Sequence, residues 1–412
     1  MKASCIWKGQ GIHKTGQCGR RYVARGVLAC LLSAVMALSL VLPAAIVRVR
    51  AEELVLESPS AILIEASTGT VLFEKNADER LRPASVTKVM TLLLAFEQIS
   101  AGKMTMEDTV TLSEHAASME GSRCFFEAGE QQTVEDIIKC IIIASGNDTA
   151  VAMGEHIAGS EEAFVDMMNE RAKALGMTNT HFENACGLEA EGHLTTARDI
   201  AIMARELTVK HPEVFNYSTI WMDSITHVTR RGSEEFTLAN TNKFLNEYTG
   251  ATGLKTGYTS IAKYSMAATA TRDGVDLIAV VMGAETKEMR NADAGRLLDY
   301  GFAKCQVYED ATPYDKVGEI NIAGGKASMV KYNGEGSFSY VFTNGEDMSQ
   351  VEKGFVQDVD KAPVKAGDQI GRVVYRIGNR ELASMPVTAA EDVAAVDYQF
   401  CFLKLLFRYM AI

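Results

Sequence analysis

The sequence predicts a mixed α/β (α+β) domain with helices around an antiparallel sheet, followed by a small all-β domain. Two observations support this fold class. Between residues 52 and 305, strand-like runs stand at both ends of a series of helix-like runs, which is the order expected when sequence-distant strands close one sheet. Beyond residue 306 the helical periodicity nearly ends, and glycine-containing turns separate short strand-like runs, as in a small β domain of residues 306–390.

The elements of the first domain follow from local patterns. Two β-rich runs flank a Ser-Thr-Gly turn in residues 61–76, which indicates a hairpin. Near the end of the domain, two apolar runs meet at Asp273-Gly274, a strong hairpin signal. Apolar residues at helical spacing predict helices over 84–100, 133–144, 148–158, 161–175 and 196–209, the last with Thr195 and Thr196 as caps and Asp199 in its first turn.

Residues 1–51 are predicted to form a secretory signal. Basic residues precede an apolar run at 26–42, and Val49 and Ala51 occupy the small-residue positions of a cleavage site after Ala51. An uncleaved membrane anchor is the alternative, because 17 apolar residues nearly suffice to span a bilayer. We therefore expect the rest of the chain to be exported.

The last segment, residues 391–412, has the pattern of an amphipathic helix that lies on a membrane surface. Asp397, Lys404 and Arg408 fall on one helical stripe, and the remaining face is aromatic and aliphatic. The segment is too short to span a bilayer. The alternative is a terminal helix packed on the protein's own core.

Composition excludes several other classes of function. The formal net charge of -12 and the absence of a long basic cluster argue against a nucleic-acid partner. No sequence motif for a metal or an organic cofactor is present, so we expect neither. The five cysteines after residue 51 are widely spaced and odd in number, which favours buried thiols over a disulfide framework or a zinc site: Cys124, Cys140, Cys186, Cys305 and Cys401.

Ser85 and Lys88 form the first candidate catalytic pair. They lie three residues apart, just after Pro83, so both side chains share one face at the start of a predicted helix. A serine hydroxyl needs a base to take its proton, and a lysine is such a base only when neutral. Burial and the positive end of a helix both disfavour the ammonium form. Taken alone, the pair also fits a serine cap followed by a surface lysine.

Two later motifs favour catalysis. S-G-N at residues 145–147 follows an apolar predicted helix, and K-T-G at residues 255–257 immediately precedes the predicted strand pair. In order and spacing, the three motifs resemble S-x-x-K, S-x-N and K-T-G, which surround one cleft in the penicillin-recognising serine enzymes. Each later motif alone is typical of an ordinary turn or a chance tripeptide, but the three together predict one active site.

The residues of these motifs suit an acyl transfer. Ser145 is expected to relay a proton to the leaving amine, and Asn147 to hold a substrate backbone with its amide. Lys255 and Thr256 would offer a cation and a hydroxyl to a substrate carboxylate.

The strand that carries the third motif is also expected to shape the cleft. Gly257 removes a side chain where a substrate must lie against the strand. The backbone amides of Ser85 and Tyr258 are the expected donors of an oxyanion hole.

The wider sequence resembles the low-molecular-mass penicillin-binding proteins that are serine-type D-Ala-D-Ala carboxypeptidases. The resemblance runs from about Ala61 to Gly301, and it implies a β-lactamase/transpeptidase-like catalytic domain. The β domain and the tail also resemble the C-terminal part of that family. The segments that carry the resemblance include RPASVTKVMT, SGNDTA, NTNKFLNEYTGATGLKTGYTS and NACGLEAEGHLTTARDIAIMAREL.

The resemblance implies work at the extracytoplasmic face of the bacterial cell membrane. Such an enzyme removes the terminal D-alanine from peptidoglycan stem pentapeptides through an acyl-enzyme on Ser85, with Lys88 as proton acceptor. β-Lactam antibiotics are expected to inhibit it covalently. Arg290 matches an arginine near the family's cleft and is a candidate ligand for the substrate's terminal carboxylate, although a surface helix arginine fits the pattern as well.

The sequence departs from the family pattern after the K-T-G motif. Where the family usually reads GYTxxAGxC, this chain reads GYTSIAKYS, with Lys263 at the glycine position and Ser265 at the cysteine position. Lys263 is expected to crowd a tight bend behind the site, with an effect on local geometry and on turnover.

Several alternatives share parts of this pattern. A class A β-lactamase would need a Glu-x-x-x-Asn loop between the second and third motifs, and none is present, so fast antibiotic hydrolysis is not expected. Transpeptidase and endopeptidase activities use the same residues and stay open, as does a catalytically silent peptidoglycan-binding sensor. A histidine-dependent triad is not favoured because no G-x-S-x-G elbow is present, and His193 is expected to support the cleft wall.

Overall fold

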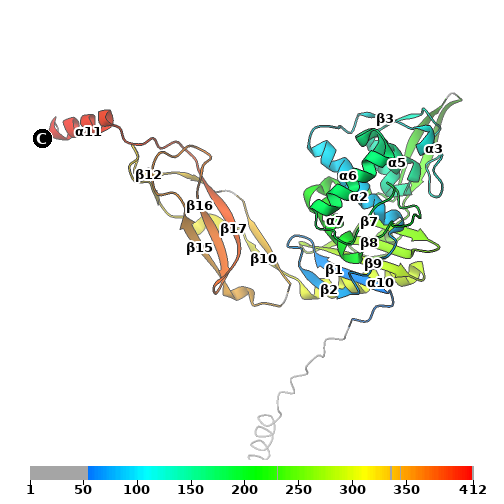
Figure 1. Ribbon diagram of the computed structural model, residues 1–412. Helices are drawn as coiled ribbons and strands as arrows, with labels where there is room; N and C mark the ends of the chain where they lie inside the picture. Colours follow the sequence, from blue (N-terminus) through cyan, green and yellow to red (C-terminus); the bar gives the residue numbers. More distant parts are fainter. Residues whose placement is uncertain (1–53, 230, 335, 344, 411–412) are drawn as a thin grey trace, which may run out of the picture. The chain divides into compact units, whose positions relative to one another are not determined.

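A five-stranded antiparallel sheet lies at the centre of the first domain (Figure 1). The computed structural model describes residues 54–410 except 230, 335 and 344, so the predicted signal lies outside the described residues. As predicted, sequence-distant strands close the sheet, because β1 pairs with β9 from Ser60 opposite Met282 to Glu65 opposite Leu277. The sheet order is β2-β1-β9-β8-β7, with bounds Val71–Lys75, Ser60–Glu65, Val275–Ala284, Lys263–Arg272 and Ala251–Thr259.

The two faces of this sheet bury different cores. Along β1, Ile62 and Ile64 belong to a core shared with most of the helices, whereas Ala61 and Leu63 point to the opposite core beneath α10, Lys287–Lys304. This alternation follows from the two-residue period of a strand. The sheet is therefore covered on both faces, as expected for a layered domain.

The helices follow the predicted ranges with two local differences. The predicted helix 84–100 is a 3₁₀ turn, η1, followed by α2, and the predicted helix 133–144 is α4 followed by a π-helical turn, η2. At the start of α7, the Thr196 side chain accepts a hydrogen bond from the Asp199 amide at 3.1 Å, which confirms that cap. The bounds are Ala84–Thr87 (η1), Lys88–Ser100 (α2), Val134–Lys139 (α4), Cys140–Ala144 (η2), Asn147–Ala158 (α5), Glu161–Ala174 (α6) and Ala197–Lys210 (α7).

Shorter elements complete this domain. β3 pairs with β4, and β5 pairs with β6 in a hairpin. Their bounds, with those of the remaining short helices, are Thr109–Thr111 (β3), Glu114–Ala117 (α3), Gln131–Thr133 (β4), Pro212–Val214 (η3), Phe215–Ser218 (α8), Met222–Thr229 (β5), Gly232–Ala239 (β6) and Phe244–Glu247 (α9).

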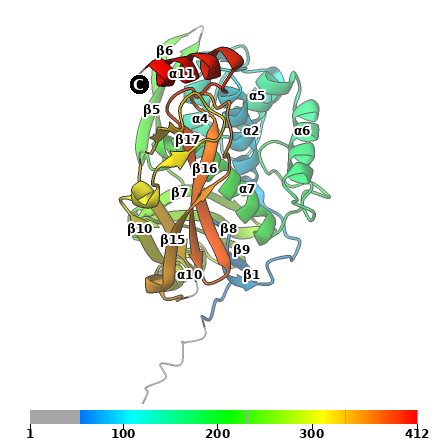
Figure 2. The same ribbon diagram turned by 90° about the vertical axis from the view of Figure 1, so that its left-hand side faces the viewer.

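The second domain is all-β apart from two 3₁₀ turns, as predicted. Its four-stranded sheet has the order β13-β17-β16-β15, with β15, β16 and β17 side by side in Figures 1 and 2. Tyr375 and Phe338 stack at 3.7 Å between ring centroids inside its core. The bounds are Gln306–Asp310 (β10), Pro313–Lys316 (η4), Ile320–Asn321 (β11), Met329–Val330 (β12), Tyr332–Asn333 (β13), Phe338–Phe342 (β14), Met348–Gln350 (η5), Val351–Gln357 (β15), Gln369–Ile377 (β16) and Arg380–Ala389 (β17).

The tail contains helix α11, Tyr398–Met410, and none of its residues is buried. Residues just before it contact the β domain: Val393 is buried, and Asp397 forms an ion pair with Lys326 at 2.6 Å. In the described part of the chain, no helix has both the length and the apolar character needed to cross a bilayer.

Candidate active site

Ser85 lies in η1, one turn before the first residue of α2, Lys88. Pro83 caps the 3₁₀ turn with a φ of -77°, which its ring favours. The Lys88 side chain is fully buried. It points back at Ser85, with 3.0 Å between its Nζ atom and the Ser85 Oγ atom. The predicted contact between hydroxyl and amine is therefore present.

The Lys88 amine has two further partners. It donates hydrogen bonds to the Asn147 Oδ1 atom at 2.7 Å and to the Cys186 carbonyl oxygen at 2.8 Å. Both of these atoms only accept, whereas the Ser85 hydroxyl can also donate. A neutral amine has two N–H bonds and one lone pair, so it satisfies all three partners when Ser85 donates its proton toward Lys88.

Burial also favours the neutral amine. It lowers the pKa of Lys88 to about 8, because the charged form loses its hydration inside the protein. Asp148, at the start of α5, acts in the opposite direction through its charge but does not contact the amine. At neutral pH a useful fraction of the molecules therefore carries an uncharged base beside the hydroxyl.

The backbone at the end of the π-helical turn η2 determines where the side chains of Ser145 and Asn147 point. Ser145 takes a left-handed φ of 61°, which ends η2 and starts α5 two residues later. The Asn147 Nδ2 atom donates to the Glu120 carbonyl at 2.6 Å, which fixes its Oδ1 atom toward Lys88. Both ends of this amide are used within the protein, so the structure gives Asn147 the task of holding Lys88. Its contact with a substrate backbone stays a prediction.

Lys255 reaches Ser145 from strand β7. Its amine donates to the Ser145 Oγ atom at 2.8 Å and to the Thr256 carbonyl at 3.1 Å. The side chain is almost completely buried, and burial, followed by the charge of Lys88, holds its pKa well below the ordinary value. The three motifs thus meet through two lysine contacts, from Lys88 to Asn147 and from Lys255 to Ser145.

Gly257 allows strand β7 to lie directly against η1, the 3₁₀ turn that carries Ser85 and is called the nucleophile turn below. A Cβ atom at this position would lie 2.8 Å from the Pro83 carbonyl oxygen and 3.1 Å from the amide nitrogens of Ser85 and Val86. Such distances to backbone atoms leave no room for a side chain. The close approach of the 3₁₀ turn therefore explains the glycine, and the expected room for a substrate against the strand stays a prediction.

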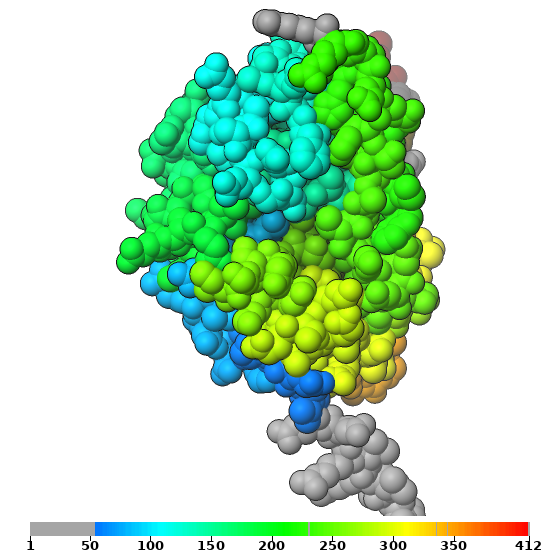
Figure 3. All heavy atoms as spheres, turned by 90° about the vertical axis from the view of Figure 1, so that its right-hand side faces the viewer, coloured from blue at the N-terminus to red at the C-terminus, as the bar shows by residue number. Residues whose placement is uncertain are grey.

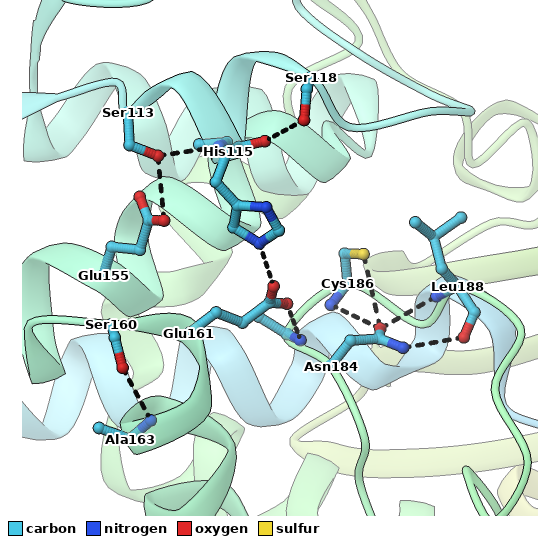
Figure 4. Close-up of polar contacts among 12 residues, drawn as sticks. Ser113, His115, Ser118, Glu155, Ser160, Glu161, Ala163, Asn184, Cys186 and Leu188 are labelled. Carbon is cyan, nitrogen blue, oxygen red and sulfur yellow. Dashed lines mark hydrogen bonds and ion pairs between the residues drawn. The ribbon is translucent and has the colours of Figure 1, made fainter.

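A loop that precedes α7 supplies a group that the sequence does not reveal, the Cys186 carbonyl. The Asn184 Oδ1 atom organises this loop by accepting the amides of Cys186 and Leu188 at 3.3 and 3.0 Å (Figure 4). It also accepts the Gly187 amide at 2.7 Å. Glu161 of α6 accepts the amide of Ala185, the residue before Cys186, at 3.0 Å and pairs with His115 (Figure 4). The loop is therefore held from inside and from α6.

His193 fastens the same loop to the nucleophile turn. Its Nδ1 atom accepts the Glu183 amide at 3.2 Å, so its Nε2 atom carries the proton and donates to the Thr87 hydroxyl at 2.8 Å. Burial lowers the pKa of His193 to about 4, which keeps the ring neutral at ordinary pH. The supporting role expected for His193 agrees with these contacts.

A cleft of about 910 Å³ opens in front of the two serines. Figure 3 shows this face hollowed between cyan and yellow-green segments, with blue atoms at the base of the hollow. Lys88, Asn147 and Lys255 lie behind the lining rather than in it. The predicted site residues that line the cleft are Ser85, Ser145, Thr256, Gly257, Tyr258 and Arg290.

Arg290 brings a buried positive charge to this cleft. It lies in the first turn of α10 and is only 6% exposed. Among the described residues it forms no ion pair with a carboxylate, and its hydrogen bonds go to the neutral Asn291. Burial lowers its pKa to about 10. The expected alternative, a surface arginine, does not describe this side chain.

The two departures from the family pattern cause no crowding. Lys263 adopts a left-handed φ of 58°, a conformation that favours glycine, and its half-exposed side chain pairs with Glu285 at 3.3 Å. Ser265 is buried, and its hydroxyl accepts the Gly283 amide at 3.3 Å. The strand is nevertheless irregular at this point, with a register shift between Tyr264 and Met266, and an effect on turnover stays a prediction.

This fold and this site define a class of serine acyl-transfer enzymes that use a buried lysine in place of histidine, the penicillin-recognising serine enzymes. Residues 47–286 match the family described as D-alanyl-D-alanine carboxypeptidase, and residues 307–395 match the C-terminal domain of penicillin-binding protein 5. The chain therefore belongs to the D-alanyl-D-alanine carboxypeptidase family and is an enzyme of that type.

Relatives of known identity agree with this assignment. The chain is 42% identical to the D-alanyl-D-alanine carboxypeptidase DacF of Bacillus subtilis over 86% of this chain and 90% of that protein. It is 31% identical to DacC of Escherichia coli, over 83% and 87%. The crystal structure of penicillin-binding protein 5 from Haemophilus influenzae superposes with a TM-score of 0.64 at 29% identity, over 82% of this chain and 98% of that one.

Proposed function

We propose that this carboxypeptidase releases the terminal D-alanine of peptidoglycan stem peptides through an acyl-enzyme on Ser85, with neutral Lys88 as the base. The observation that carries the proposal is the set of three partners around the Lys88 amine, two of which only accept hydrogen bonds. The lone pair left over faces the Ser85 hydroxyl, as a general base requires.

In the first half of the reaction, the Ser85 oxygen attacks the carbonyl carbon of the penultimate D-alanine, and its proton passes to Lys88. The amides of Ser85 and Tyr258 stabilise the oxyanion. The peptide C–N bond then breaks, and the leaving amine takes a proton from the Ser145 hydroxyl, which Lys255 replaces through its 2.8 Å contact.

In the second half, water attacks the ester. Its proton returns to Ser145 and Lys255, and Lys88 gives its proton back to the Ser85 oxygen. Each lysine ends in its starting state. The products are the shortened peptide and D-alanine. An amine in place of water would give transpeptidation, and a cross-linked peptide in place of the pentapeptide would give endopeptidase action.

Thr256 and Arg290, which line the cleft, are proposed to hold the terminal carboxylate of the substrate, and the Lys255 amine is proposed to supply positive charge from behind the lining. Burial disfavours the charge on Lys255 in the empty cleft, and an arriving carboxylate would favour it again by Coulomb attraction. Arg290 offers a buried guanidinium without an anionic partner among the described residues. A buried charge of this kind is costly unless an anion compensates it.

Labelling with a fluorescent penicillin, followed by measurement of D-alanine released from a pentapeptide, tests the proposed function. The parent is expected to show both signals, and Ser85→Ala neither, because in the described part of the chain no other hydroxyl forms a hydrogen bond with the Lys88 amine. Label without D-alanine release would favour the sensor or another acyl acceptor. Absence of label in the parent would overturn the proposal.

We also propose that the mature chain begins after the signal and works at the extracytoplasmic membrane surface, with α11 as its anchor and the β domain between anchor and catalytic domain. Large apolar side chains of α11 are exposed, among them Tyr398, Leu405 and Phe407 at 86, 69 and 68%. Lys404 and Arg408 on the same helix favour a surface with anionic lipids. Such a helix binds a membrane in the plane of its interface.

Removal of residues 398–412 from the signal-processed protein is expected to release it from membranes while leaving carboxypeptidase activity in solution. The deletion begins at Tyr398 because Val393 and Asp397 are part of the β domain's contacts. Sedimentation with vesicles that contain anionic lipid measures the binding. A truncated protein that still sediments with the vesicles would show that α11 is not the anchor.

A further inference from the structure

A short chain of hydrogen bonds leads from the cleft to helix α9. Arg290 donates to the Asn291 Oδ1 atom twice, from Nε at 3.0 Å and from one terminal nitrogen, Nη2, at 2.9 Å. Asn291 in turn donates from Nδ2 to the Glu247 Oε2 atom at 2.6 Å. Glu247 is the last residue of α9, so the chain joins two helices that line the same cleft.

Glu247 fixes the orientation of the Asn291 amide. A carboxylate accepts hydrogen bonds and does not donate them, so the Nδ2 atom must face Glu247 and the Oδ1 atom must face Arg290. With the opposite orientation, two acceptors would face each other on one side and donors would face each other on the other. The pair of amide and carboxylate therefore presents one oxygen to the guanidinium.

The contact with Asn291 uses one edge of the Arg290 guanidinium and leaves another edge without a partner among the described residues. The Nε and Nη2 atoms converge on the Asn291 oxygen, whereas the Nη1 atom has no hydrogen bond to any described residue. The edge formed by the two terminal nitrogens can bind a carboxylate with two parallel hydrogen bonds. Tyr264 lies beside the group, with its ring centroid 5.9 Å from the Arg290 Cζ atom.

We propose that Asn291, oriented by Glu247, is a positioning residue that turns the free edge of Arg290 toward the terminal carboxylate of the substrate and so selects peptides that end in a free carboxylate. The proposal rests on the proposed function, in which Arg290 binds that carboxylate. A neutral amide suits the task because it fixes the guanidinium without neutralising its charge. An aspartate in its place would compensate the charge that the substrate is meant to compensate.

Kinetic constants for two peptide substrates distinguish the proposed positioning role of Asn291 from a purely structural one. The first is an N-acylated peptide that ends in D-Ala-D-Ala with a free carboxylate, and the second is the same peptide with a C-terminal carboxamide. For Asn291→Ala we expect KM for the carboxylate peptide to rise about tenfold with little change in kcat, because a positioned charged hydrogen bond is lost from substrate binding. We expect Asn291→Asp to raise it further. Neither variant should change kcat/KM for the carboxamide.

Glu247 and Glu288 provide a matched pair of controls. Both are acidic residues whose charges act on Arg290, but only Glu247 bonds to Asn291, whereas Glu288 pairs with Lys287 at 3.5 Å. Glu247→Ala is expected to reproduce the effect of Asn291→Ala, and Glu247→Gln to restore most of the parent KM because its carbonyl oxygen still accepts the Asn291 donor. Glu288→Gln removes the same charge and should change KM by at most about twofold.

The outcomes are distinct. If Asn291→Ala lowers kcat/KM for both peptides equally, or leaves both unchanged, the positioning role is wrong while the parent still distinguishes the two peptides. If Glu288→Gln acts as strongly as Glu247→Ala, charge and not orientation is responsible, and the proposal also fails. A parent that neither binds penicillin nor releases D-alanine would instead overturn the proposed function itself.

Discussion

Replacement of Lys88 by methionine is expected to slow acylation by penicillin about a thousandfold, since general base catalysis contributes on that scale. Methionine has a similar length and fits the fully buried position, but it leaves the Asn147 Oδ1 atom and the Cys186 carbonyl without their donor, at a cost of about 1–3 kcal/mol each, so the melting temperature of the variant is measured alongside. Stopped-flow measurement of labelling by a fluorescent penicillin gives the rate. Acylation of Lys88→Met at the parent rate would contradict the role of the amine.

Lys88→Arg tests whether the base or only its hydrogen bonds matter. An arginine can donate to the Asn147 and Cys186 oxygens but stays protonated at every accessible pH, so it cannot take a proton from Ser85. We expect this variant to be as slow as the methionine variant. If Lys88→Arg keeps the parent rate, the residue acts as a fixed charge and not as a base.

The pH dependence of acylation follows from the same amine. Burial lowers the pKa of Lys88 to about 8, so the neutral and active form becomes more populated as pH rises through that value. At pH 7 about a tenth of the molecules carry the neutral base, and the acylation rate should rise about tenfold toward a plateau above pH 9. A rate that falls as the pH rises from 7 to 9 would mean that the ammonium form is the active one.

The sequence predicted the parts of the site that depend on spacing along one element. Ser85 and Lys88 meet because residues three apart share a face of a helical turn, and this holds in a 3₁₀ turn as well as in an α-helix. The apolar periodicity also located the helices. It did not reveal the 3₁₀ start or the π-helical end, because neighbouring hydrogen-bond patterns bury nearly the same side chains.

The parts that the sequence did not reveal are backbone groups and burial. The Cys186 carbonyl holds Lys88, but a carbonyl oxygen has no sequence signature. Asn147 carries the expected motif, yet which atoms its amide contacts depends on the Glu120 carbonyl, another backbone group. For Arg290, the sequence left a surface position open, and only packing between α10 and the sheet decides that this residue is buried.

Gly187 offers the sharpest test of these backbone contacts. It has a left-handed φ of 89°, and a Cβ atom there would lie 1.9 Å from the Ala84 carbonyl oxygen and 2.4 Å from its carbon. These are backbone atoms of the nucleophile turn, so they cannot move aside as a flexible side chain could. We expect Gly187→Ala to push the loop away from η1 and to draw the Cys186 carbonyl away from Lys88.

The expected loss for Gly187→Ala is about a hundredfold or more in the penicillin acylation rate, because displacement of a catalytic group by about 1 Å costs that much. The neutral form of Lys88 should also become less populated. Water would enter beside the amine, and the pKa of Lys88 would move back toward its ordinary value. A shift of the pH–rate profile to higher pH would report this effect separately from the rate itself.

Gly159 supplies the matched control for the loop. Its φ is 87°, close to that of Gly187, but a Cβ atom there would have nothing within 4 Å. Both alanine variants carry the strain of a left-handed residue, about 1–2 kcal/mol, and only Gly187→Ala adds the collision with Ala84. Gly159→Ala should therefore lower the melting temperature slightly and acylate at the parent rate. Equal acylation rates for the two variants would mean that the loop does not need this close contact to keep the Cys186 carbonyl on Lys88.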